Sequence, residues 1–273
     1  MKRTSHTRVD VAGLEFDPIT QQEILEDISE HLGGKSSYSF TVYKPYVEFF
    51  TSAWADAELM ELLHRADRVV ADGVAVQWAA SYLAGPRGFG HWLKSLCFDI
   101  QKPQWRSQII PERGAGVDAT QRLLKKAVRA GWTVGIFGGP RDTKRTSEAI
   151  QRLFPDVKLA GVWNGFYDEQ EEKKIISEIK HAYPDILFVA QGFPRQERLI
   201  DTYKNSKLAR VLIGEGGTFD FDSMGGELKR APKWMRKLGL EWLWRLVLQP
   251  NRWRRQLALP RFMWRIYKIG QQK

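Results

Sequence analysis

The amino-acid sequence predicts an α/β fold with a mostly parallel, doubly wound sheet that carries helices on both faces. Along the middle of the chain, short runs rich in β-branched and aromatic residues alternate with longer helical patterns. Strands joined by crossovers of this length form right-handed βαβ units. At 273 residues, of which 43% are hydrophobic, the chain is long enough for one large or two modest domains with a real core.

The elements of this Rossmann-like sheet follow from their residue patterns. The strand runs are SFTVY (39–43), RVVA (68–71), TVGIF (133–137), KLAGVW (158–163), ILFVA (186–190) and VLI (211–213). The helical patterns between them lie at 46–65, 74–83, 117–130, 143–154, 169–181 and 195–205.

The turns after the strand runs predict an active site at the carboxyl edge of the sheet. In open α/β sheets, ligands bind outside the carboxyl ends of the strands, where backbone amides and helix N-termini hold phosphate. The turns contain Asp72-Gly73, Gly138-Gly139-Pro140, Gly165, Gly192-Phe193-Pro194 and Gly214 to Gly217. The run GIFGG lacks the GxGxxG spacing, and no acidic ribose-binding residue follows it, so a dinucleotide site has little support.

The segment 85–112 interrupts the alternation with prolines, glycines and aromatic residues. We expect a long inserted loop there, or a helix and a loop. Two interpretations stay open, a packed surface excursion and a lid over an acceptor or a membrane.

The charge of the chain is concentrated at its end. Residues 228–273 carry thirteen Lys or Arg and one acid, Glu241, which is +12 in a chain whose total is +10. Five of the eleven tryptophans lie in the same segment. We therefore expect an α/β core of residues 1–227 and a basic, Trp-rich helical appendage of residues 228–273 that associates with an anionic membrane surface.

Several common features are missing from the sequence. No apolar run approaches the roughly 18 residues that would span a bilayer, and no signal peptide is recognisable. The single cysteine, Cys97, cannot form an internal disulfide, and the five histidines show no paired spacing for zinc. We expect a cytoplasmic protein.

Two acidic sites have open interpretations. Asp72, at the end of a strand and before Gly73, is placed either to act as a general base or to cap the next helix, and spacing alone favours the cap. Asp220 and Asp222 have the DxD spacing of a cation site, but two carboxylates offer fewer oxygen ligands than hard cations usually take.

Two basic groups have open interpretations as well. Arg195 and Gln196 are placed to reach a sugar or phosphate, whereas Glu197 suits an ordinary helix start. Arg245, Arg252 and Arg255 share one face if the helix continues past Pro250, where they can grip a diphosphate or form a solvated basic face.

Taken together, these motifs resemble the WecG/TagA/CpsF family, the bacterial N-acetylmannosaminyltransferase type of glycosyltransferase family 26. The matching motifs are VVADGVAV (69–76), ERGAGVD (112–118), GIFGGP (135–140), GVWNGFYD (161–168), GFPRQE (192–197), GEGGTFDF (214–221), KRAPKWMRKLGLEWLWRL (229–246) and PNRWRR (250–255).

The resemblance implies an inverting transfer of a sugar from a UDP-sugar to a polyprenyl-diphosphate-linked saccharide in cell-surface glycan synthesis. It places this transfer at the inner leaflet, by a protein that is peripheral on the inner face of the cell membrane. It implies that Asp72 is the catalytic base, that Gln196 lies at the substrate site, and that the C-terminal arginines complete the site over the diphosphate. It further implies that no metal or other cofactor is needed. The expected substrate-binding residues are Lys44, Gly138, Gly139, Asn164, Gly165, Gln191, Gly192, Arg195, Gln196, Glu197, Gly217, Arg245, Arg252 and Arg255.

The sequence departs from the family pattern at three places. Lys44-Pro45-Tyr46 stands where the family commonly has Asn-Pro-Glu, and Val42 replaces a Thr. Asp222 is an added acid, and the segment 85–112 is atypical. The donor sugar therefore need not be N-acetylmannosamine.

Two other classes of function fit part of the sequence. A nucleic-acid-binding protein would use the basic charge and the tryptophans, and a non-catalytic scaffold would use the membrane affinity alone. The motifs favour the transferase. We expect it to bind no nucleic acid, and a homo-oligomer is compatible with the sequence.

Overall fold

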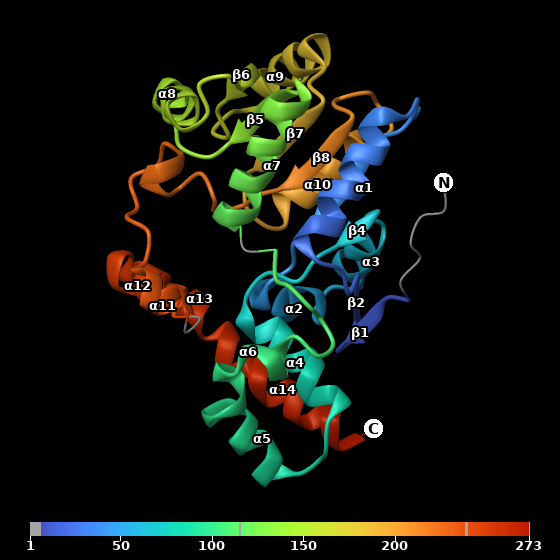
Figure 1. Ribbon diagram of the computed structural model, residues 1–273, viewed down its shortest axis with the longest axis vertical. Helices are drawn as coiled ribbons and strands as arrows, with labels where there is room; N and C mark the ends of the chain where they lie inside the picture. Colours follow the sequence, from blue (N-terminus) through green and yellow to red (C-terminus); the bar gives the residue numbers. More distant parts are fainter. Residues whose placement is uncertain (1–6, 115, 238–239, 273) are drawn as a thin grey trace.

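The computed structural model describes residues 7–114, 116–237 and 240–272 of the chain. Its centre is a six-stranded parallel sheet with the strand order β4-β3-β8-β7-β5-β6, which confirms the α/β class (Figure 1). The strands are β3 (Phe40–Tyr43), β4 (Arg68–Val69), β5 (Thr133–Gly138), β6 (Lys158–Trp163), β7 (Ile186–Ala190) and β8 (Val211–Gly214).

Helices cover both faces of the sheet because successive side chains of a strand point to opposite faces. In β7, Phe188 belongs to the hydrophobic core on one face, whereas Leu187 and Val189 belong to the core on the other. The first face is covered by α1 (Gln21–Gly33), α7 (Gly116–Ala130) and α8 (Thr143–Leu153). The second is covered by α9 (Glu169–Ala182) and α10 (Arg195–Tyr203). The core of this second face continues into α2 (Val47–Ala53), α3 (Ala57–His64), α4 (Val74–Ala84) and α14 (Ala258–Gln272), whose main contacts are with elements outside the six-stranded sheet.

The sequence-based prediction missed three N-terminal elements. The strands β1 (Val9–Val11) and β2 (Leu14–Phe16) form a small antiparallel hairpin, and α1 follows. A signal for α1 is present in the sequence, since Thr20 and Glu23 form a capping box at its start.

The single helix expected at 46–65 is wrong, because the structure has two helices there. Asp56 is the N-cap of α3, and its side chain accepts hydrogen bonds from the backbone amides of Glu58 and Leu59. An aspartate in this role starts a new helix after the turn that ends α2.

The inserted segment is largely helical and packed. It contains α5 (Phe89–Cys97), η1 (Asp99–Gln101) and α6 (Pro103–Arg106). Trp92 of α5 donates a hydrogen bond from its indole N–H to the carbonyl of Met263 in α14, at 3.3 Å. The helix of the insertion therefore lies beside the C-terminal helix (Figure 1).

The C-terminal segment is helical, as expected. After η2 (Asp222–Met224) it consists of α11 (Lys233–Lys237), α12 (Glu241–Leu248), η3 (Pro250–Arg252), α13 (Trp253–Gln256) and α14. Phe262 and Ile266 of α14 are fully buried, and the Phe262 ring lies 4.9 Å from that of Phe50 in α2. The last helix is thus part of the core. In the described part of the chain, no helix is both long and apolar enough to cross a bilayer.

Candidate functional site

The carboxyl edge of β4, β3, β8 and β7 brings together charged and polar groups that are distant in sequence. Lys44 follows β3, Asp72 follows β4 after two further residues, and Glu215 follows β8. Gln191 follows β7. This is the edge at which the sequence predicts the site.

Asp72 occupies a turn that is fixed by backbone contacts. Its N–H donates to the carbonyl of Pro45 at 3.0 Å, and Gly73 takes a φ of +89°, which favours glycine. Gly73, not Asp72, is the N-cap of α4, and no side chain caps that helix. The helix-cap interpretation of Asp72 is therefore wrong, and its carboxylate is available for chemistry.

The electrostatic surroundings of Asp72 contain opposing contributions. Burial raises the pKa of its carboxyl above the ordinary value, while the nearby charges of Lys44 and Arg113 oppose this rise. A carboxylate with a raised pKa is a better proton acceptor than an exposed one. Arg113, from the 112–118 motif, is a residue that the sequence-based reasoning did not single out.

Lys44 and Glu215 form a buried ion pair at the centre of this edge. Thr218 donates from its hydroxyl to the second carboxylate oxygen of Glu215 at 2.6 Å. Burial lowers the pKa of Lys44 to about 8, and the charge of Asp72 opposes this shift. Glu215 was not predicted, although its place directly after a strand, in GEGG, is a signal for it.

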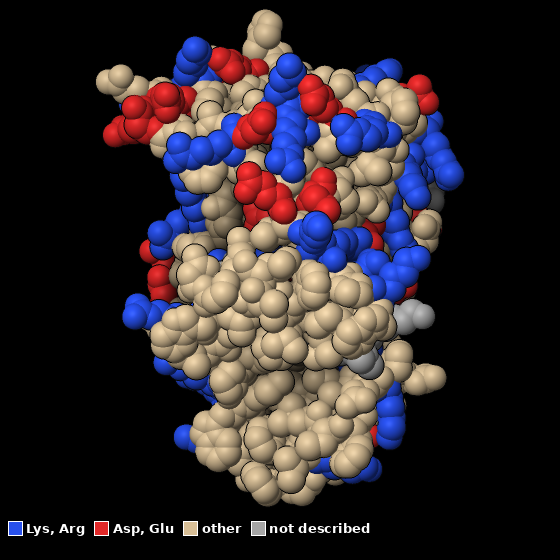
Figure 2. All heavy atoms as spheres, turned by 90° about the vertical axis from the view of Figure 1, so that its left-hand side faces the viewer, with Lys and Arg blue, Asp and Glu red and all other residues tan. Residues whose placement is uncertain are grey.

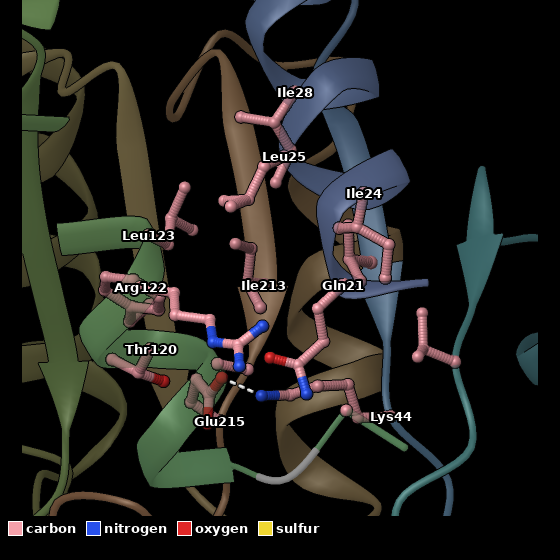
Figure 3. A pocket seen from close by; sticks show the side chains of 15 residues that line it. Gln21, Ile24, Leu25, Ile28, Lys44, Thr120, Arg122, Leu123, Ile213 and Glu215 are labelled. Carbon is pink, nitrogen blue, oxygen red and sulfur yellow. Dashed lines mark ion pairs between the residues drawn. The ribbon is translucent and has the colours of Figure 1, made fainter. Parts of the chain in front are cut away.

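The ion pair also closes one end of a pocket between α1, α7 and the sheet (Figure 3). The walls of the pocket are mainly apolar. Figure 3 shows Gln21 of α1 and Arg122 of α7 extending toward the Lys44–Glu215 pair, so the polar groups of the pocket gather at that end.

Gln196 and Glu197 are more deeply buried than their predicted role suggests. Gln196 accepts a hydrogen bond from the amide of Gly192 at 3.1 Å and donates to Glu197 at 2.7 Å. Glu197 has no exposed surface, and burial raises its pKa to about 8. Glu197 therefore holds the side chain of Gln196 in place through this hydrogen bond. In this conformation the Glu197 side chain does not line the surface expected to contact substrate.

Glycines let the turns after β5, β6 and β7 pack closely. Gly138 has a φ of +116°, and a Cβ there would lie 2.3 Å from the carbonyl oxygen of Ala190. A Cβ on Gly165 would lie 2.9 Å from Cα of Gly138, and one on Gly139 would lie 2.9 Å from Cβ of Phe219. The glycines thus allow three turns of the candidate site to pack against one another without side chains between them. Asn164 accepts from the amide of Phe166 at 2.8 Å and stabilises the adjacent turn.

Arg195 and Gln191 are connected through Tyr167, which the sequence-based reasoning did not single out. The Tyr167 hydroxyl donates to the side-chain oxygen of Gln191 at 2.7 Å. The Arg195 guanidinium lies 4.2 Å from the centre of the Tyr167 ring and donates to the carbonyl of Gly165 at 3.3 Å. Arg195 is exposed at the rim and is positioned to meet an anionic ligand.

Arg245 and Arg255 lie on separate helices, so the continuous helix that a shared arginine face requires is not formed. Arg245 pairs with Asp220 and lies over Gly217, where an added Cβ would be 2.7 Å from its Nη1. Arg255 donates from Nε to Glu48 of α2 at 2.8 Å. The break between α12 and α13 sends the two side chains to different partners. The side chain of Arg252 lies outside the described residues.

The DxD pair does not converge on one point. Asp220 is engaged by Arg245, and the Asp222 carboxylate accepts from the amide of Ser223 at 2.7 Å. Within the described residues, no three His, Cys, Asp or Glu side chains are grouped as they are around a metal ion.

Comparison with known proteins identifies relatives of this chain. A protein of Bacillus subtilis (strain 168) is 36% identical over 165 residues, which cover 60% of this chain and 63% of that protein. Proteins of Staphylococcus aureus strains NCTC 8325 and N315 are 27% identical over 268 residues, 98% of this chain and 95% of theirs. All three are named N-acetylglucosaminyldiphosphoundecaprenol N-acetyl-beta-D-mannosaminyltransferase.

A family model provides the broadest match. The model for the glycosyl transferase WecG/TagA/CpsF family matches residues 9–89 and 103–273, and so includes every strand of the sheet and the C-terminal helices. The protein therefore belongs to the WecG/TagA/CpsF family of glycosyl transferases.

Proposed function

We propose that this protein is an inverting glycosyltransferase that moves a hexose, N-acetylmannosamine or a related sugar, from a UDP-sugar to a polyprenyl-diphosphate-linked saccharide. The observation that carries the proposal is the carboxylate of Asp72, held at the carboxyl edge of the sheet with a raised pKa. The names of the relatives support an acceptor of the N-acetylglucosaminyl-diphosphoundecaprenol class.

The proposed reaction is a single displacement. A hydroxyl oxygen of the acceptor sugar attacks the anomeric carbon of the donor as Asp72 takes the hydroxyl proton. The bond between that carbon and the diphosphate oxygen breaks, and its electrons leave with UDP. Attack from the face opposite to the leaving group inverts the anomeric configuration.

The negative charge that develops on UDP needs fixed partners. Arg195 at the rim and Arg245 over Gly217 are suited to this task. Arg245 would then exchange its pairing with Asp220 for one with the diphosphate. We expect the transfer to proceed without a divalent cation, so that turnover after chelation of metals equals turnover before.

The lipid portion of the acceptor determines where the enzyme works. A polyprenyl chain keeps its diphosphate at a membrane surface, so we propose that the protein is peripheral on the inner face of the cell membrane. The basic C-terminal segment supports this location, because anionic lipids attract clustered Lys and Arg.

The substitution Asp72→Asn tests the base assignment. It keeps the shape of the side chain and removes the proton acceptor, so we expect turnover to fall by about 10²–10⁴-fold with little change in the affinity for UDP-sugar. Transfer is measured with radiolabelled UDP-hexoses and a short-chain prenyl-diphosphate acceptor that carries N-acetylglucosamine. Asp156→Asn, at an exposed position, is the matched control. Turnover of the Asp72 variant close to that of the wild type would exclude Asp72 as the base.

A further inference from the structure

Exposed apolar side chains are concentrated in two parts of the molecule. Of the fifteen large apolar side chains that are exposed among the described residues, three lie in segment 85–112 and eight in segment 228–273. Figure 2 shows a broad face over the lower half of the molecule with few charged side chains except at its edges. Single exposed apolar residues are ordinary, but a contiguous apolar face indicates a binding surface.

Helix α5 of the insertion contributes apolar side chains at helical spacing. Phe89 and Leu93 lie one turn apart and are 54% and 46% exposed, and Phe98, just after the helix, is 65% exposed. The helix contains one charged residue, Lys94, and no acid. It therefore presents an apolar side to solvent, and it lacks the charged residues that usually line the solvent-facing side of a surface helix.

The position of α5 beside the C-terminal helix is fixed by aromatic contacts. The Trp92 ring lies 5.4 Å from that of Tyr267 and 6.2 Å from that of Trp264, with near-perpendicular planes in the second pair. The Phe89 ring lies 6.0 Å from that of Tyr267. These contacts make α5 and α14 parts of one rigid surface.

Helix α12 lies at the same uncharged face and borders the proposed site. None of its residues is buried, and Leu243 and Val247, one turn apart, are exposed. Arg245 of the same helix points inward to Asp220. One helix thus presents an apolar side outward and a basic side to the site.

The charges around this face have one sign. Each of the three acids in the two segments has a partner within the protein: Asp99 pairs with Lys102, Glu112 accepts from the amide of Gln21, and Glu241 lies 3.8 Å from Arg230. The exposed charged side chains of the two segments are Lys and Arg, among them Lys94, Arg254 and Arg261. An apolar face with a basic border matches an anionic lipid surface.

We propose that α5 is a second membrane-docking element, whose Phe89, Leu93 and Phe98 side chains enter the boundary between headgroups and acyl chains beside α12 and α13. The proposal rests on the proposed function, since a lipid-linked acceptor places the site at a bilayer. Most of α5 lies in residues 90–102, which the family model leaves unmatched, so this contact is an addition of this chain to the basic C-terminal segment. Two separate apolar elements would fix the tilt of the enzyme on the membrane.

Cys97 supplies a probe at the required place. It is the only cysteine of the chain, is exposed, and lies one helical turn after Leu93. A polarity-sensitive fluorophore on Cys97 is expected to shift to shorter wavelength and to be quenched by lipid-bound quenchers when the full chain binds vesicles of phosphatidylglycerol and phosphatidylcholine. A label that stays in water while the protein sediments with the vesicles would overturn the proposal.

A matched pair of variants gives the second measurement. The double variant Leu93→Ser, Phe98→Ser is expected to weaken partitioning into these vesicles by about tenfold or more, because each side chain loses part of its transfer free energy. Leu153→Ser on α8, 44% exposed in the wild type, is expected to bind like the wild type. Unchanged partitioning of the double variant would refute a role for α5.

The alternative to a membrane on this face is a second copy of the chain. The face would be a dimer interface if the wild type is dimeric by light scattering and does not bind vesicles, and if the double variant is monomeric. That result would overturn the membrane proposal. The proposed function is tested separately, because transfer to a water-soluble short-chain acceptor needs no vesicle. Absence of that transfer would count against the proposed function, whereas the Cys97 signal and the partitioning report on α5 alone.

Discussion

Lys44 and Glu215 carry opposite charges where water is nearly absent. Their side chains are 8% and 3% exposed, and a hydrogen bond from the Thr218 hydroxyl to the Glu215 carboxylate complements the ion pair. Removing two charges from water has a large unfavourable free energy, which the pair offsets only while both partners are present. At this position the family commonly has asparagine. A charged lysine is stable in the protein interior there because Glu215 pairs with it.

We expect Lys44→Met to destabilise the protein by about 3–5 kcal/mol, because it leaves the Glu215 carboxylate buried and unpaired. The double variant Lys44→Met, Glu215→Gln should recover a substantial part of this loss. Free energies of unfolding from urea titrations of the wild type, both single variants and the double variant provide the measurement. Additive effects of the two substitutions would show that the residues are not coupled.

Glu197 links stability to pH. Burial raises its pKa from 4.5 to about 8, so the folded state keeps a proton between these values that the unfolded state releases. The free energy of unfolding should therefore decrease as pH rises from about 4.5 to about 8 through this group.

Glu197→Gln mimics the protonated carboxyl and is expected to remove this pH dependence. At pH 7 the variant should be more stable than the wild type by about 1–3 kcal/mol. Thermal unfolding across the window compares it with Glu169→Gln, a control whose wild-type side chain is 89% exposed. A pH slope in the Glu197 variant equal to that of the wild type would contradict the assignment.

At the scale of elements, the C-terminal helices differ in how they are held. Before α11, Arg230 forms a bidentate ion pair with Asp118 of α7, in which Nη1 and Nη2 each donate to one carboxylate oxygen at 2.8 Å. Arg245 and Arg255 attach α12 and α13 through single acids. By contrast, α14 is held by buried apolar side chains. Helices α12 and α13 are thus suited to rearrange on binding, because each can exchange its acid for an anionic group of a ligand.

The core role of α14 predicts a large difference between two phenylalanines. Phe262→Ala should lower the free energy of unfolding by about 3–5 kcal/mol, since it leaves a cavity beside Phe50 and Trp54. Phe98→Ala, at a position 65% exposed, should change it by about 0.5 kcal/mol or less. Denaturant titration of both variants gives the comparison, and similar losses would mean that α14 is not part of the core.

For the whole molecule, the uneven distribution of charge along the chain is the main feature. The +12 of residues 228–273 exceeds the +10 of the chain, so the remainder is slightly acidic. Helices α11 to α14 of the basic segment lie below the six-stranded sheet in Figure 1, and so does α5. Such a distribution orients the protein before contact is made.

This charge distribution predicts a salt-dependent affinity for membranes. Binding to vesicles should weaken as salt rises from about 0.05 to 0.5 M, because the Debye length falls below about 5 Å, and it should also weaken as the anionic lipid fraction falls. Sedimentation with vesicles of graded composition measures both effects. Binding that is independent of salt and lipid charge would rule out the electrostatic contribution to membrane affinity. Tighter binding to RNA than to vesicles would instead favour a nucleic-acid-binding protein.

Local patterns were sufficient for much of the fold. The strand runs at 133–137 and 186–190 are rich in β-branched and aromatic residues and end in glycine turns, so the sheet and its carboxyl edge follow from the sequence. The helix α1 was missed although the capping box of Thr20 and Glu23 marks its start. The break at Asp56 was missed because a helix pattern on both sides of a cap looks continuous.

The residue patterns alone were enough to predict the α/β class, the basic segment and the family, and to propose the carboxyl edge of the sheet for the site. Which charges meet at that edge follows only from the folded arrangement. It paired Lys44 with Glu215, placed Glu197 beneath Gln196, separated Arg245 from Arg255 and joined α5 to α14. The physical reason is that secondary structure follows from local patterns, whereas ion pairs, burial and shared surfaces depend on residues brought together by crossovers between distant parts of the chain.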